Sequence, residues 1–199
     1  MHAHTHFVGG ALAGLAATSF VSPAVALVVV ATATLTAPLP DIDHPGSTYG
    51  RWIPLPGVAR VHGHIEPYRR GIGGNADASF GHVGRRTPFG IGWHRGGMHS
   101  LLASAMTAAL LGGLAARLHP GWGLAVGIGT LAGMLSHLAL DALNVSGQAW
   151  LWPFSSQRIR FRWPHIRVGS GGEWIVEVVL IGILVLFVHT ALPHLFAAF

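Results

Sequence analysis

The chain has 199 residues, of which 51% are hydrophobic and only 10% are charged. A water-soluble domain of this size has too little interior to bury so much apolar surface, so the composition excludes an ordinary soluble globular protein and predicts a lipid-facing exterior. The chain has no Cys, which excludes disulfides and thiolate metal sites and leaves His nitrogen and carboxylate oxygen as the ligands for any metal.

Apolar stretches follow one another along the chain and predict about five helices. They cover about residues 7–21, 23–38, 99–118, 122–143 and 174–197. A helix that crosses a hydrocarbon core of about 30 Å needs about 20 residues, which only the last three stretches supply. Pro23 suits the first turn of a helix, so the first two stretches form either a hairpin or one kinked span. We therefore expect an all-α polytopic bundle, with residues 1–199 forming a single membrane-embedded domain.

Two polar loops, residues 39–97 and 144–172, hold all but one of the 12 basic residues, and every one of these is Arg. The positive-inside rule then predicts that both loops are cytoplasmic and that the short turn at residues 118–121 lies outside. A pI near 11.3 would also suit nucleic-acid binding, but these arginines are split between two loops rather than aligned on one surface. We expect a multi-pass protein of the inner (plasma) membrane whose partner is the lipid bilayer, with no nucleic acid and no cleavable signal peptide.

Histidines and aspartates gather where the predicted helices meet this cytoplasmic edge. His137 and Asp141 are four residues apart on a helix, so both side chains project from one face and can share a metal. Asp41 and Asp43 follow a helix end, where their mutual repulsion favours a bound cation. We predict a site for one or more divalent metal ions at this edge, with ligands His6, Asp41, Asp43, His99, His137 and Asp141.

Simpler explanations remain for each pair. His137 and Asp141 can form a hydrogen bond that only joins helices, and Asp41 with Asp43 can occupy a solvated turn next to proline. Against these explanations, ionisable groups near the apolar zone are costly and are usually functional. The sequence leaves open whether further histidines join the site, namely His4, His44, His62, His64 and His82.

Three further residues are candidates for catalysis. His94 is expected in the polar loop and His99 in the first turn of the next helix, and Arg95 beside them suits a phosphate oxyanion. Glu177 opens the last apolar stretch on the same side as the site and is a candidate ligand or general base. The macrodipole at a helix N-terminus also favours Glu there, so the alternative is a purely structural role.

Three motifs together resemble a known family. They are Pro40-Asp41-Ile42-Asp43-His44, then His94-Arg95-Gly96 leading to His99-Ser100, and Ser136-His137-Leu138 through Asp141, Asn144, Gly147 and Leu151-Trp152-Pro153-Phe154. Over roughly residues 4 to 154 they resemble the YdjM-like family of membrane-bound, predicted metal-dependent hydrolases. That family is distantly similar to the zinc-dependent phospholipase C and single-strand nuclease superfamily, whose His-x-x-x-Asp pair is matched by His137 and Asp141.

The resemblance implies zinc and the hydrolysis of a phosphoester, such as that of a phospholipid headgroup, by a metal-activated water. Two other functions stay open. A metal transporter or sensor would need ligands at several depths of the membrane. A structural metal site would have a closed ligand set without an open position.

Overall fold

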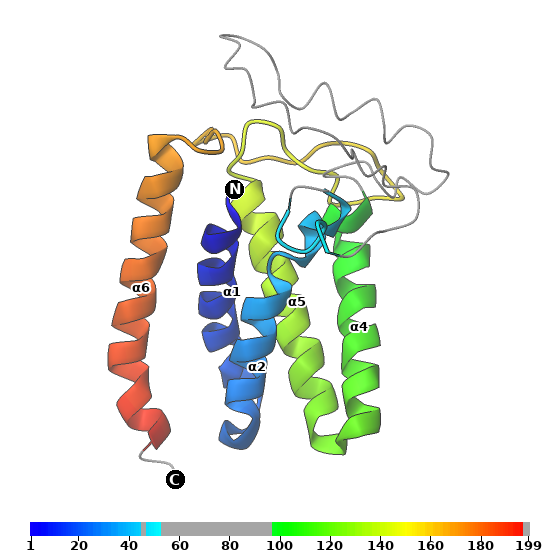
Figure 1. The fold of residues 1–199 in the computed structure, drawn as a ribbon, viewed down its shortest axis with the longest axis vertical. Coiled ribbons are helices and arrows are strands. Elements are labelled where there is room, and N and C mark those ends of the chain that lie inside the picture. The colour runs from blue at the N-terminus through cyan, green and yellow to red at the C-terminus, as the bar shows by residue number, and fades with distance from the viewer. Residues whose placement is uncertain (45–46, 53–96, 197–199) are drawn as a thin grey trace.

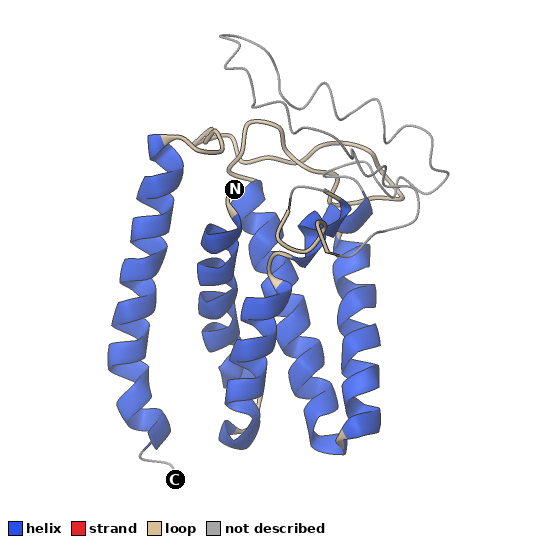
Figure 2. Ribbon diagram, in the orientation of Figure 1, coloured by secondary structure: helices blue, strands red, loops and turns tan. Residues whose placement is uncertain are grey.

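The computed structural model describes residues 1–44, 47–52 and 97–196, with side chains described up to residue 190. These residues contain five α-helices and four short 3-10 turns, and they contain no β-strand beyond two isolated bridges. The helices are α1 (Ala3–Ala17), α2 (Pro23–Thr36), α4 (Leu101–Leu118), α5 (Gly123–Asp141) and α6 (Gly171–Phe196). They stand side by side with nearly parallel axes (Figures 1 and 2), which confirms the predicted all-α bundle.

The first two helices form the hairpin rather than a kinked span. The 3-10 turn η1 (Thr18–Phe20) ends α1, and Pro23 starts α2 at a position where its missing N–H costs nothing. The two helices pack closely at Gly14, which has no side chain: a Cβ there would lie only 2.9 Å from the Cα of Val30 in α2.

Helix α5 is the centre of the bundle and packs against α1, α2 and α4. Glycine permits close contacts here: a Cβ on Gly129 would lie 2.6 Å from the carbonyl oxygen of Val29 in α2. Between α4 and α5, a Cβ on Gly112 would lie 2.8 Å from the carbonyl oxygen of Gly123. Helix α6 packs mainly along α1 and stands at the edge of the bundle (Figure 1).

Within the described part of the chain, four helical segments are long and apolar enough to cross a membrane, which is one more than we expected. They are Pro23–Asp43, Leu101–Leu118, Pro120–Asp141 and Gly171–Thr190. The expectation was wrong for the second apolar stretch, because the 3-10 turn η2 (Leu39–Asp43) prolongs α2 into a segment of 21 residues. Helix α1, with 15 residues, remains shorter than a span.

Candidate metal centre

The last turns of α5 supply two members of the candidate centre. The side chains of His137 and Asp141 are buried on one face of the helix, and His137 Nε2 lies 3.8 Å from Asp141 Oδ2. Their spacing of four residues produces this alignment, as the sequence predicted.

Asp41 and His99 come from two 3-10 turns that flank the long polar loop. Asp41 belongs to η2, where Pro38 and Pro40 lie just after α2. His99 belongs to η4 (Gly97–His99) and precedes α4, so the prediction that it occupies the first turn of that helix was wrong. Ser100 explains the difference: its side chain accepts a hydrogen bond from the N–H of Ala103 at 3.1 Å and caps the helix one residue later.

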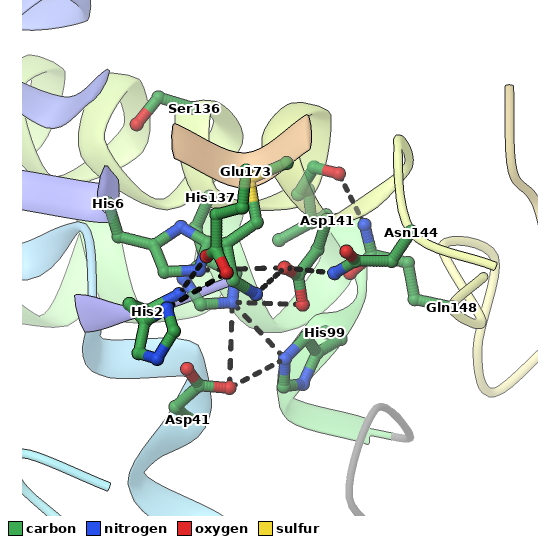
Figure 3. Close-up of polar contacts among 12 residues, drawn as sticks. His2, His6, Asp41, His99, Ser136, His137, Asp141, Asn144, Gln148 and Glu173 are labelled. Atoms are coloured by element: carbon green, nitrogen blue, oxygen red, sulfur yellow. Dashed lines mark hydrogen bonds and ion pairs between the residues drawn. The ribbon is translucent and has the colours of Figure 1, made fainter. Parts of the chain in front are cut away.

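The four side chains converge at one end of the bundle (Figure 3). His99 Nε2 lies 3.2 Å from Asp41 Oδ1 and 3.3 Å from His137 Nε2, and one ligand atom from each of the four residues lies within 4.8 Å of the others. A tetrahedral zinc ion with bonds of about 2.0–2.1 Å to nitrogen holds neighbouring ligand atoms roughly 3.3 Å apart. Two imidazoles and two carboxylates are also a donor set that zinc accepts, so these residues fit a divalent metal.

Burial makes this group costly unless its charges are balanced. The side chains of His99 and His137 are fully buried, that of Asp141 is 2% exposed and that of Asp41 is 17% exposed. Burial acts to lower the pKa of His99, but the hydrogen bond and charge of Asp41, with the charges of Asp43 and Asp141, raise it above its ordinary value. The larger exposure of Asp41 makes its side the accessible side of the group.

Two predicted ligands lie next to this group rather than within it. His6, in α1, is buried and stacks on His137 with ring centroids 3.7 Å apart, and its Nε2 lies 3.5 Å from Asp141 Oδ1. Its Nδ1 forms no hydrogen bond to any described residue. Asp43 is buried in η2, and its charge acts on His99 without its carboxylate joining the four.

Polar contacts fix the end of α5 that carries the site. Asn144 Nδ2 donates to Asp141 Oδ1 at 2.8 Å, and the Met1 amino group lies 2.7 Å from the same oxygen. The side-chain amide of Gln148 donates to the carbonyl of Leu138. Asn144 belongs to the sequence motif that contains Asp141, whereas the role of Gln148 was not predicted, because its spacing of ten residues from Leu138 follows no helical pattern.

A second set of His–Glu contacts joins the start of α1 to the start of α6. His2 Nδ1 lies 2.8 Å from Glu173 Oε2, and His4 Nε2 lies 2.9 Å from Glu177 Oε2. Glu177, predicted as a catalytic residue, therefore contacts His4 and not the four-residue group. No local pattern in the sequence signalled the pairing of Glu177 with His4.

The remaining candidates are placed as follows. His94 and Arg95 lie outside the described residues, as do His62, His64 and His82. His44 follows η2 without joining the group. His119 caps the far end of α4, where its ring packs against Trp122.

Together, the apolar helices and the buried His and Asp group define a multi-spanning membrane protein with a candidate metal site at one end of its helix bundle. Within that class, a family model described as "YdjM inner membrane protein" matches residues 1–195, and the chain belongs to this family.

Two relatives carry the same name. The proteins called "Inner membrane protein YdjM" from Escherichia coli (strain K12) and from Shigella flexneri are each 33% identical to this chain over 150 residues. The match covers 73% of this chain but only 58% of each relative, so the chain spans little more than half the length of these relatives. No solved structure matches the chain.

Proposed function

We propose that this protein is a membrane-bound, metal-dependent hydrolase that cleaves a phosphoester, such as the headgroup bond of a phospholipid. The observation that carries the proposal is the convergence of Asp41, His99, His137 and Asp141, from three separate segments, within 4.8 Å. Charged and imidazole groups are rarely buried together near a membrane unless they bind something. A cytoplasmic site in the inner membrane is part of the proposal, supported by the arginines of both loops and by the family.

Zinc is the proposed metal because the ligands are imidazoles and carboxylates at tetrahedral spacing. His6 and Asp43 are the remaining proposed ligands. His6 suits this role because its ring is buried at the edge of the group and its Nε2 points toward Asp141. A second ion held between His6 and Asp141 is compatible with this arrangement, so one or more ions are proposed.

The chain's own residues would orient substrate and protons around this group. When bound, a divalent metal supplies a Lewis acid that polarises the scissile bond and acidifies a water. Asp41 is the most exposed member of the group, so substrate would approach on its side. His94 and Arg95 are proposed to bind the phosphate oxyanion and Glu177 to accept a proton, all three on the basis of the sequence.

Metal content is the first test. The protein purified in detergent should contain zinc in a fixed ratio, measured by elemental mass spectrometry, and the double variant His137→Ala, Asp141→Ala should lose it. His119→Ala is the matched control because this histidine lies at the opposite end of the bundle. Equal metal content in the double variant and the native protein would disprove the centre.

Turnover is the second test. The native protein, reconstituted in vesicles, should release headgroups from at least one member of a phospholipid panel, and a chelator should abolish the release. A protein that keeps its metal but hydrolyses no member of the panel would contradict the enzyme and favour a structural metal site. Accumulation of zinc inside the same vesicles would instead favour a transporter.

A further inference from the structure

The segment between α5 and α6, residues 142–170, has a charge pattern unlike the rest of the chain. It contains four arginines and no acidic residue, since no Asp or Glu lies between Asp141 and Glu173. All four arginines are exposed, namely Arg158, Arg160, Arg162 and Arg167. We call this segment the arginine loop. The metal centre uses none of these side chains.

The arginine loop is held against the end of the bundle. The N–H of Phe161 donates to the carbonyl of Ala142 at 2.8 Å, and the N–H of Ile166 donates to that of Leu143 at 2.9 Å. A backbone pair between Gln148 and Ile159 closes the loop on itself. Because candidate membrane spans lie on both sides of it, the loop is confined to the membrane surface, across the end of the bundle in Figure 1.

The four arginines fall into two pairs. Arg158 and Arg160 donate to the carbonyls of Ser146 and Val145, so they help to hold the loop together. Among the described residues, no group accepts a hydrogen bond from the side chain of Arg162 or Arg167, and no carboxylate forms an ion pair with either of them. These two guanidinium groups are available to an external anion, and guanidinium binds phosphate in a bidentate manner.

Exposed aromatic rings accompany these charges. The side chains of Phe154 and Trp163 are 87% and 83% exposed, and Trp174 at the start of α6 is 61% exposed. Exposing such large apolar rings to water is unfavourable in free energy. In membrane proteins, aromatic side chains concentrate in the region of the lipid headgroups. Trp163 directly follows Arg162 in the chain, and both residues are exposed.

We propose that the arginine loop is a docking surface for anionic phospholipids, with Arg162 and Arg167 binding the headgroup phosphate and Trp163 inserting beside it. The partner is a lipid because the loop lies between two membrane spans and combines positive charge with exposed aromatic rings. The surface is separate from the metal centre and does not depend on hydrolysis. It would fix the depth at which the end of the bundle sits in an anionic membrane.

The test measures lipid binding to the full chain in detergent micelles by native mass spectrometry. Short-chain phosphatidylglycerol, short-chain phosphatidylcholine and inorganic phosphate are titrated separately. The native protein should prefer phosphatidylglycerol, and each of Arg162→Gln and Arg167→Gln should weaken that binding about fivefold, the effect expected for one charge at a membrane surface. Arg162→Lys keeps the charge and should restore most of the affinity.

Arg117→Gln is the matched control, because Arg117 is exposed at the far end of α4 and the substitution removes the same charge. It should leave phosphatidylglycerol binding unchanged. Metal content and melting temperature, measured on every variant, identify any loss of fold, and the lysine variant then decides whether charge matters. The proposal would be overturned if the native protein bound phosphatidylcholine as well as phosphatidylglycerol, or if Arg117→Gln weakened phosphatidylglycerol binding as much as the loop variants do. Full competition by inorganic phosphate at the same concentration as the lipid would overturn it as well.

Discussion

Asp141 connects the candidate metal group to the residues that hold it in place. One carboxylate oxygen faces His137, and the other accepts the hydrogen bond from Asn144. A carboxylate fixed by such a bond keeps its orientation when a metal leaves and loses less freedom when a metal returns. Asn144 is therefore a positioning residue whose importance can be measured without touching a ligand.

Asn144→Ala should weaken zinc binding about tenfold, because removing a partner of a metal ligand typically costs 10–100-fold in affinity. The measurement is competition against a chromophoric chelator. Gln157→Ala removes a similar amide from the exposed part of the arginine loop and should have no effect. If both variants bind zinc as the native protein does, Asn144 does not orient Asp141.

The sequence was sufficient for some of these residues and not for others. The pair His137 and Asp141 was predictable because a helix has a known period, and Asp41 and His99 were predictable because they adjoin apolar stretches at the same edge. The distances among the four depend on how three separate segments pack, which no local pattern determines. The contacts of His2 and His4 with α6 were not predicted for the same reason, since about 170 residues separate the partners.

At the scale of the helices, small residues determine how closely α5 approaches its neighbours. Any side chain on Gly133 would collide with the carbonyl of Ala33 in α2, and one on Gly129 would meet that of Val29. Backbone cannot move aside as a flexible side chain can, so these glycines set the distance between two helices that both lead to the site. The glycine-rich stretches were visible in the sequence, but which glycines face a partner was not.

Gly133→Ala should lower stability by about 1–3 kcal/mol, the usual cost of overpacking, and should reduce zinc content because α2 carries the turn with Asp41. Gly113→Ala is the control: no atom lies within 4 Å of its Cβ position, so it should be neutral or stabilising by up to about 1 kcal/mol. Thermal unfolding in one detergent compares the two. A Gly133 variant that melts like the native protein would show that α2 and α5 can separate at no cost.

At the scale of the whole molecule, the polar groups are concentrated at one end. The candidate metal group, the His–Glu contacts and the arginine loop all lie at the end where α1 and α6 begin, whereas the turn between α4 and α5 lies at the other (Figure 1). This polarity followed from the order of apolar and arginine-rich segments, so the sequence predicted it well. It did not predict that α2 reaches spanning length, because proline after a helix normally predicts its end.

The orientation in the membrane can be tested directly, because the chain contains no native cysteine. Ser156→Cys in the arginine loop should be protected from a membrane-impermeant maleimide in intact cells and should react after lysis. Gly121→Cys, in the turn at the other end, should react in intact cells. The reverse pattern would place the metal centre on the outer side and exclude a cytoplasmic substrate.

The position of α6 has a practical consequence. Every member of the four-residue group precedes residue 142, and α6 begins beside the group and runs to the other side of the bundle. A fluorescent reporter placed after this helix would therefore lie at the end of the bundle opposite the candidate metal group. Such a reporter would leave the more exposed side of the group, at Asp41, unobstructed.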